Sequence, residues 1–322
     1  MSFAAIGITT IIWVLYGYSL TFGTSRNGLI GDFSNVGLAK TLDQVVGPEG
    51  HQIPTLAFAM FQLTFAIITV ALLSGAIADR AKYGSWVLFV GVWVTLVYIP
   101  VAHWAFASQG GNGGWIIDKL GALDFAGGTV VEINSGAAAL ALALVLGKRD
   151  GFKRDPMRPH NMPLVLLGAG MLWFGWFGFN AGSALSAGQL AATAMINTQI
   201  ATAAASMTWV AYEKYRDGKA TTLGVASGAV AGAVAITPAC GYLNPLGALI
   251  LGLIAGVVSA WAVTRKYKYG YDDSLDVVGV HGVGGILGMI SIGFLATLTA
   301  NSAGANGLFF HGGTSQIDRQ LI

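Results

Sequence analysis

Two ionisable residues, Glu132 and His281, lie within long apolar stretches of this sequence. Each follows a Leu-Asp pair and a glycine-rich turn, in Leu123-Asp-Phe-Ala-Gly-Gly-Thr-Val-Val-Glu132 and in Leu275-Asp-Val-Val-Gly-Val-His281. A carboxylate at the centre of a membrane-spanning helix costs about 2.5–3.5 kcal/mol on insertion scales, so it normally faces a partner or a watery cavity. We therefore predict that Glu132 and His281 face each other across the pore of a membrane channel or transporter.

Such a pair would share a single proton in one of two neutral forms. Either Glu132 is ionised and His281 is protonated, or Glu132 is protonated and His281 is neutral. Losing the shared proton leaves the pair with a charge of −1, which favours an entering cation. The pair is thus a candidate proton relay, because histidine changes its charge near neutral pH.

Aromatic residues gather at helical spacing in two other apolar stretches. Phe65 lies on one face of the second stretch, and Trp176, Phe179 and Ser183 lie close together on the fifth. Aromatic faces attract a cation by about 0.5–2 kcal/mol, and a serine hydroxyl adds an acceptor. The pattern favours an external vestibule for a small monovalent cation, although packing or lipid-facing aromatics are the alternative for each residue alone.

The remaining polar candidates have simpler interpretations. Asp124 and Asp276 each precede an apolar stretch, where a carboxylate caps the free N–H groups of a helix, with direct contact to a ligand as the alternative. The other histidines fall in loops or near a span end and are interpreted as structural or solvated. They are His51, His103, His160 and His311.

The composition is that of a polytopic membrane protein. Of the 322 residues, 54% are hydrophobic and only 10% are charged, whereas soluble domains carry about 25% charged residues. The single cysteine, Cys240, excludes an intrachain disulfide and a cysteine-based metal site. No nucleophile, metal or phosphate-binding pattern appears. We therefore expect no enzyme, no cofactor, no metal and no nucleic-acid partner.

An all-α membrane fold follows from the spacing of the apolar stretches. At about 20 residues per span, we predict nine transmembrane helices, with the long polar loop 24–54 as a surface cap. The predicted spans are 3–23, 55–78, 84–106, 124–147, 163–184, 188–212, 221–240, 245–264 and 276–299.

Basic residues predict the orientation of these spans. The loops after the second, fourth, sixth and eighth spans hold 13 Lys and Arg, and the alternate loops hold three. Because cytoplasmic loops are enriched in Lys and Arg, the four basic loops should be cytoplasmic. The fourth and ninth spans then run antiparallel, as inverted-repeat transporter halves require.

Several motifs together resemble the Amt/Mep/Rh ammonium transporter family. They are Asp124-Phe-Ala-Gly-Gly-Thr-Val-Val131, Trp176-Phe-Gly-Phe-Asn-Ala-Gly-Ser183, Thr237-Pro-Ala-Cys-Gly-Tyr242 and Asp276-Val-Val-Gly-Val-His-Gly282. The resemblance covers nearly the whole chain. It implies a homotrimer of eleven-helix protomers in the cytoplasmic membrane, in which residues 1–322 form a single ammonium transporter domain. On this reading the first and last helices of the family are absent, and the chain is truncated at both ends.

The resemblance also implies a role for each candidate residue. The implied external cation site holds Phe106, Trp176 and Ser183 with Asp124 nearby, the gate is Phe65 and Phe179, and the pore centre is Glu132 and His281. Two departures from the family stand out. Glu132 occupies a position that is usually histidine, and Phe106 stands where tryptophan is usual, with Trp104 as the nearby alternative.

The expected function is transport of ammonium or methylammonium. NH4+ would be recruited outside and would cross an apolar pore as NH3, with or without a relayed proton; K+ has no proton to give up. A PII-type nitrogen-regulatory protein is a candidate partner of the full-length form, although the sequence does not identify the regulator. The alternatives are an ammonium sensor, expected to carry an appended signalling domain, and a gas or urea channel, which needs neither cation-binding aromatics nor a buried acid.

Overall fold

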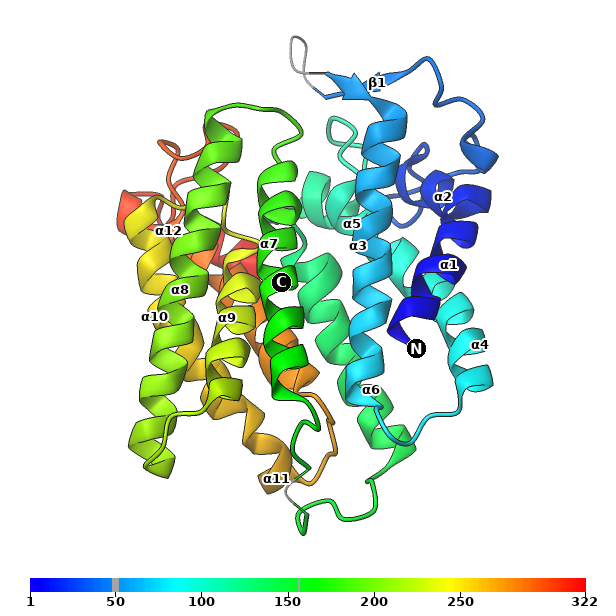
Figure 1. Cartoon of the computed structure of the whole chain (residues 1–322). Coiled ribbons are helices and arrows are strands. Elements are labelled where there is room, and N and C mark those ends of the chain that lie inside the picture. Colours follow the sequence, from blue (N-terminus) through cyan, green and yellow to red (C-terminus); the bar gives the residue numbers. More distant parts are fainter. Residues whose placement is uncertain (48–51, 156) are drawn as a thin grey trace.

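Long helices running side by side along one common direction make up the body of the protein (Figure 1). The computed structural model describes residues 1–47, 52–155 and 157–322. The main helices are α1 (Ser2–Ile12) with α2 (Tyr18–Phe22), α3 (Thr55–Ala76), α4 (Tyr83–Trp93) with α5 (Ile99–Phe106), α6 (Asn134–Leu146), α7 (Met162–Gly182), α8 (Gln189–Asp217), α9 (Thr222–Ile236), α10 (Pro245–Val263) with α11 (Arg265–Tyr269), and α12 (Val283–Leu295).

Several of these helices contain or begin with a π-helical turn. Such turns join α1 to α2 and α4 to α5, at Trp13–Gly17 and Val94–Tyr98. Two more, Gly128–Ile133 and Val278–Gly282, lead directly into α6 and α12. π-Helical turns are rare and occur frequently at functional sites. The second pair contains both Glu132 and His281.

Each of the nine predicted spans corresponds to a helical segment among the described residues. Seven of these segments are long and apolar enough to cross a membrane, and they include neither Gln189–Asp217 nor Thr222–Ile236. α9 is only 15 residues long, and α8 carries many polar side chains. The all-α polytopic prediction is confirmed.

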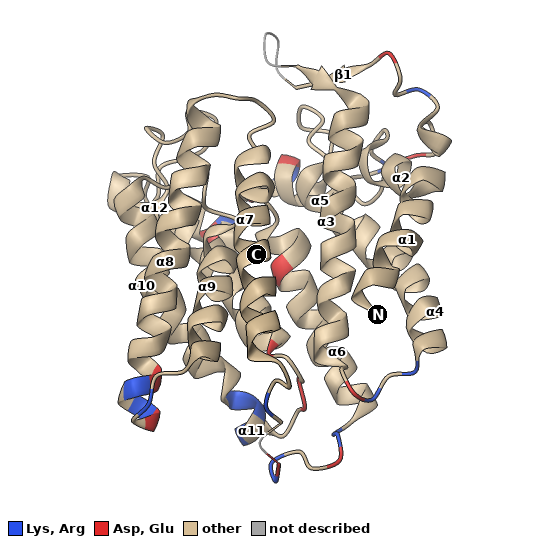
Figure 2. Ribbon diagram, viewed as in Figure 1, with Lys and Arg blue, Asp and Glu red and all other residues tan. Residues whose placement is uncertain are grey.

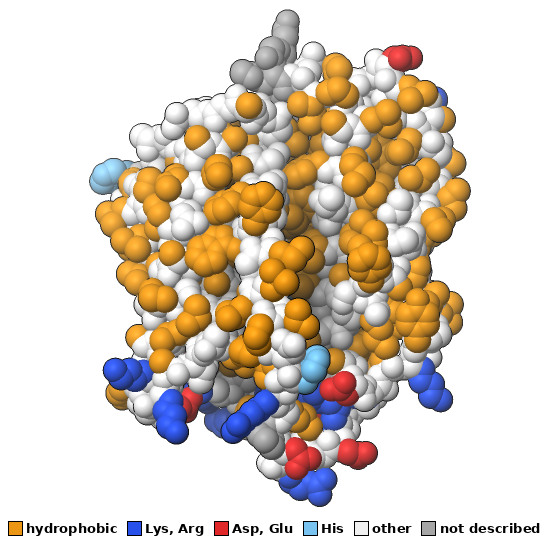
Figure 3. All heavy atoms as spheres, viewed as in Figure 1, with side chains coloured by type: hydrophobic (Ala, Val, Ile, Leu, Met, Phe, Trp, Pro, Cys, Tyr) orange, Lys and Arg blue, Asp and Glu red, His pale blue; other side chains and the backbone are white. Residues whose placement is uncertain are grey.

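Charged residues gather at one end of the helical body, where the cytoplasmic loops were predicted (Figure 2). The belt above this end is covered with hydrophobic side chains, as expected of a lipid-facing surface (Figure 3). Arg149 follows α6 and Asp272 precedes α12, and their side chains form hydrogen bonds of 2.9 Å. The end of the fourth span thus lies beside the start of the ninth, as an antiparallel arrangement requires.

The predicted surface cap packs on the opposite end of the body. Its strands β1 (Val45–Val46) and β2 (Ile53–Pro54) pair antiparallel, with Val45 opposite Pro54 and Val46 opposite Ile53. His103 of α5 joins this loop to α2, because its ring nitrogens form hydrogen bonds of 2.8 Å with the Ser25 hydroxyl of the loop and 2.7 Å with the Thr21 carbonyl of α2. His103 is therefore structural, and His51 lies outside the described residues.

Glycines bring α8, α9 and α10 into backbone contact. A Cβ atom at Gly232 would lie 2.5 Å from the Ala201 carbonyl oxygen, and one at Gly252 would lie 2.6 Å from the same atom. Small residues at this spacing let helices approach closely in lipid. These glycines therefore serve helix packing.

A short helix near the end of the chain, α13 (Ser315–Leu321), fastens the segment that precedes Asp124. The Gln320 side chain accepts a hydrogen bond of 2.7 Å from the Leu123 amide and donates one of 2.9 Å to the Leu123 carbonyl. It also donates to the Met289 carbonyl of α12 at 3.2 Å. One amide side chain therefore joins the start of the fourth span to the ninth.

Candidate functional site

Glu132 and His281 form a buried pair at the centre of the helical body. The distance from the Glu132 Oε2 atom to the His281 Nδ1 atom is 2.6 Å, and the two residues are 1% and 7% exposed. A contact this short between a carboxyl and an imidazole is typical of a charge-assisted hydrogen bond. The pairing predicted from the two spans is therefore present in the structure.

The helices that carry this pair begin later than the sequence indicated. The predicted spans start at Asp124 and Asp276, whereas the helical turns begin at Gly128 and Val278. Glu132 therefore lies four residues into its helix and His281 lies three. The chain bends or turns just before each helix.

Asp124 caps the turn that holds Glu132. Its carboxylate accepts hydrogen bonds from the backbone N–H groups of Gly127, Gly128 and Thr129 at 2.7–2.8 Å. Gly127 has a φ angle of +108°, a conformation that other residues rarely adopt. The capping interpretation is confirmed, and the backbone N–H groups occupy both oxygens of the carboxylate.

Three phenylalanines from three different helices meet beside the turn that Asp124 caps. The Phe65 and Phe179 rings are stacked, with their centroids 4.1 Å apart. Phe106 contacts Phe65 edge-on at 5.7 Å. A Cβ atom at Gly127 would lie 3.5 Å from the Phe65 ring, so this cluster adjoins the Asp124 turn. The structure brings together the predicted gate pair and one residue of the predicted cation site.

Trp104, the alternative to Phe106, is engaged elsewhere. Its indole N–H donates a hydrogen bond of 2.8 Å to the Leu29 carbonyl in the external loop. Its ring lies 5.9 Å from that of Trp115. Of the two aromatic residues, Phe106 is therefore the one that lies against Phe65.

Trp176 and Ser183 lie on either side of Phe179 along α7. The Trp176 ring contacts Phe179 edge-on at 6.0 Å, and its N–H donates to the Thr237 hydroxyl at 2.8 Å. Ser183 donates to the Phe179 carbonyl at 2.9 Å, which leaves the lone pairs of its hydroxyl free to accept. Thr237, which belongs to the motif Thr237-Pro-Ala-Cys-Gly-Tyr242, thus fixes the orientation of Trp176, a role that the motif alone does not indicate.

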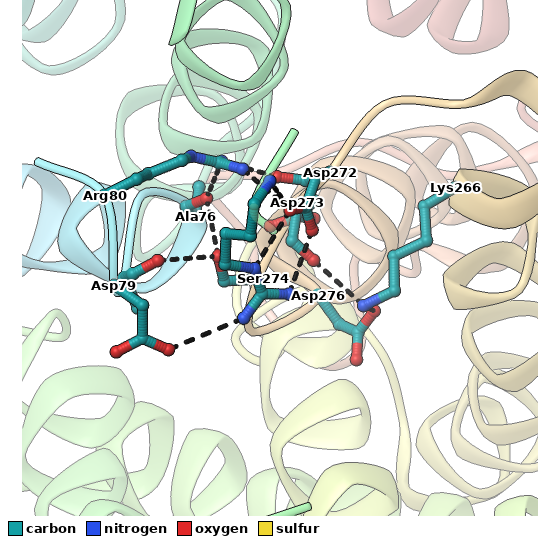
Figure 4. A network of polar contacts seen from close by, with 10 residues as sticks. Ala76, Asp79, Arg80, Lys266, Asp272, Asp273, Ser274 and Asp276 are labelled. Atoms are coloured by element: carbon teal, nitrogen blue, oxygen red, sulfur yellow. Dashed lines mark hydrogen bonds and ion pairs between the residues drawn. The ribbon is translucent and has the colours of Figure 1, made fainter. Parts of the chain in front are cut away.

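A network of charged residues joins several loops at the basic end of the body (Figure 4). Asp272 is fully buried and binds Arg80 and Arg149, each at 2.9 Å. These three residues come from the loops after α3, α6 and α11. Burial raises the pKa of Asp272, but the hydrogen bonds and charge of Arg149 outweigh it and hold the pKa below its ordinary value. Asp272 therefore stays ionised and joins the three loops.

Asp273, rather than Asp276, caps the helix that holds His281. Its Oδ2 atom accepts a hydrogen bond of 2.7 Å from the Val278 N–H. Asp276 has a φ angle of +65°, and its carboxylate forms an ion pair of 2.7 Å with Lys266. The capping prediction for Asp276 is wrong, because the left-handed backbone at this position turns the side chain away from the helix.

A buried acid–imidazole pair in a bundle of apolar helices, reached past a cluster of aromatic rings, defines a membrane transporter or channel. Comparison with known proteins gives the particular family: residues 1–322 match the Ammonium Transporter Family. The chain belongs to this family of membrane transporters. Its function is accordingly ammonium transport, and the prediction of a transporter rather than an enzyme is confirmed.

Individual relatives agree with this assignment. The chain is 52% identical to an ammonium transporter of Mycobacterium tuberculosis H37Rv over 344 residues, covering all of this chain and 72% of the relative. It is 49% identical to an ammonium transporter of Bacillus subtilis, covering 77% of that protein. The crystal structure of Saccharomyces cerevisiae Mep2 superposes with a TM-score of 0.89 at 36% identity, covering 98% of this chain and 71% of Mep2.

Proposed function

We propose that this protein recruits NH4+ at its outer face and conducts NH3 through an apolar pore, with Glu132 and His281 as a proton relay. The single observation that carries the proposal is the 2.6 Å contact between the Glu132 and His281 side chains. Two groups that both titrate, buried together and bonded to each other, can pass a proton between them without exposing a full charge to the apolar interior. K+ cannot shed a proton, so the same pore excludes it.

The recruiting site in this proposal consists of Phe106, Trp176 and Ser183. The two aromatic rings offer faces to a cation, and the Ser183 hydroxyl oxygen offers an acceptor. Asp124 contributes through its charge rather than by direct contact, because backbone N–H groups already occupy its carboxylate. The Phe65–Phe179 stack separates this site from the pore and forms the gate.

We further propose that the protein forms one membrane domain and assembles as a homotrimer in the cytoplasmic membrane. It also transports methylammonium and binds a PII-type regulatory protein. The support is the family resemblance and the cluster of Lys and Arg at one end of the body (Figure 2). The resemblance to the solved structure of a protein named Sensor Amt Protein, with a TM-score of 0.86 at 29% identity, keeps an ammonium sensor as the second candidate.

The test is the charge moved per substrate in proteoliposomes. Glu132→Gln keeps the shape of the side chain but removes its negative charge, so ammonium-evoked current should be lost while neutral NH3 passage can persist. Glu132→His should recover part of the current. Glu213→Gln, at the basic end of α8 and outside the proposed path, is the matched control. Unchanged current in Glu132→Gln would contradict the relay.

A further inference from the structure

The two helices that carry the proposed relay pair touch through glycine backbone rather than through side chains. A Cβ atom at Gly136 of α6 would lie 2.2 Å from the Gly282 Cα atom and 2.5 Å from the Gly282 nitrogen. Gly282 directly follows His281. Ordinary contact for a Cβ atom begins at 3.4 Å, so a methyl group at Gly136 would require the backbone beside His281 to move by about 1.2 Å.

A second glycine contact lies directly against Glu132. A Cβ atom at Gly285 would lie 2.7 Å from the Glu132 Cβ atom and 3.1 Å from the Ile133 nitrogen. Measured against the same 3.4 Å, a methyl group here would push the root of the Glu132 side chain away by about 0.7 Å. Gly136 of α6 therefore fixes the position of the backbone beside His281, and Gly285 of α12 fixes the position of Glu132.

The π-helical turns direct the side chains toward this crossing. Glu132 donates its backbone N–H to the Gly127 carbonyl, five residues earlier, at 3.1 Å. His281 lies within the equivalent turn, Val278–Gly282. These wider turns bring the Glu132 and His281 side chains to the crossing itself, so the distance between the backbones determines the distance between the side chains.

We propose that Gly136 and Gly285 are positioning residues for ammonium transport: by holding the two pore helices in backbone contact, they keep Glu132 and His281 close enough to exchange a proton. The inference rests on the proposed function of that pair. The tolerance is small, because a 2.6 Å bond lengthened by about 1 Å is no longer a hydrogen bond. The two glycines therefore determine how much charge accompanies each ammonium.

A graded alanine series tests the proposal. Gly136→Ala has the largest overlap and Gly285→Ala a smaller one. Gly282→Ala has almost no overlap, because a Cβ atom there would lie 3.3 Å from its nearest neighbour. Gly170→Ala, on α7, has none, because nothing lies within 4 Å of a Cβ atom there. Ammonium-evoked current and methylammonium uptake are measured together in proteoliposomes, with thermal unfolding of each variant in detergent.

The ratio of current to uptake is the decisive quantity. It should fall about tenfold or more in Gly136→Ala and Gly285→Ala, because losing a hydrogen bond between charged partners shifts an equilibrium by at least that factor. It should stay at the wild-type value in Gly170→Ala and close to it in Gly282→Ala. If Gly136→Ala does not fold, Gly285→Ala decides the question.

Three results would overturn the inference. The first is a proportional fall in current and uptake, which is what a purely structural role produces. The second is a ratio in Gly285→Ala equal to that of the wild type while Glu132→Gln changes it, which would leave the relay intact and remove only the role of the glycines. The third is a fall in the ratio of current to uptake in Gly282→Ala as large as in Gly136→Ala, because the added methyl group overlaps its neighbours much less at Gly282. An unchanged ratio in Glu132→Gln itself would instead refute the proposed function.

Discussion

Replacing Asp273 by asparagine should raise the free energy of unfolding at neutral pH, although it removes the negative charge of the side chain that caps a helix. Asp273 is 1% exposed; its Oδ2 atom accepts from Val278, and its Oδ1 atom has no partner within the described residues. Burial, and after it the negative charge of Asp276, raises the pKa of Asp273 to about 6. The favourable charge of Lys266 and the hydrogen bond from Val278 only partly offset this shift.

The size of the effect follows from the shift. The ordinary pKa is 3.8 and the folded value is about 6, and each unit corresponds to about 1.36 kcal/mol. Keeping Asp273 ionised therefore costs the folded state about 3 kcal/mol. This cost is complete above pH 6, declines between pH 6 and 3.8 as the folded protein takes up the proton, and is absent below pH 3.8. Asparagine avoids it, and its amide oxygen can accept the same bond from Val278.

Thermal unfolding in detergent between pH 7.5 and pH 4.5 measures this prediction. Asp273→Asn should be more stable than the wild type at pH 7.5, by up to about 3 kcal/mol, and the gain should shrink as the pH falls. Asp272→Asn is the matched control and should be destabilised at neutral pH, because Asp272 binds Arg80 and Arg149. A gain independent of pH, or a loss as large as that of Asp272→Asn, would refute the reasoning.

Two further substitutions test the gate and the cap. Phe179→Ala should alter ammonium uptake far more than Phe174→Ala, because Phe179 stacks on Phe65 whereas Phe174, on the same helix, is 79% exposed; equal small effects would locate the gate elsewhere. Asp124→Asn should lower the free energy of unfolding by about 1–3 kcal/mol, the cost of leaving a buried donor unpaired, because an amide nitrogen would face the Thr129 N–H. Asp124→Ala should lower it further, and unfolding midpoints equal to the wild type in both variants would show that the cap does not stabilise the turn.

The helices and the central pair could be predicted from residue type and spacing. Twenty-residue apolar stretches indicate spans without any knowledge of tertiary contacts, and an acid and a histidine in mid-span indicate partners, because neither is tolerated alone in lipid. The Phe65–Phe179 contact was anticipated only through the family resemblance. Periodicity places a ring on a face of its helix but does not show which other helix it meets.

Other features depend on where helices begin, which spacing alone does not show. The cap of the ninth span was assigned to Asp276 because that residue stands nearest to the apolar stretch. The structure uses Asp273, since the chain turns through a left-handed conformation before Val278. Gln320 could not have been linked to Leu123 either, because 197 residues separate them.

A stacked aromatic pair is worth about 0.5–1.5 kcal/mol beyond its burial, and this energy lowers the fraction of time for which the Phe65–Phe179 stack is open. Phe65 is 1% exposed and meets Phe61, Phe106 and Phe179, whereas Phe179 is only partly buried. Phe179 is therefore the ring that moves. Breaking the stacking contact alone lowers the population of the open rotamer by a factor of about 2 to 13, and partly exposed side chains change rotamer within nanoseconds or somewhat longer. Phe179 also packs against all three buried clusters of the helical body, so its displacement costs more than the stacking contact alone. In the proposed path this ring controls how often ammonium enters, and discrimination from K+ falls to the apolar passage behind it.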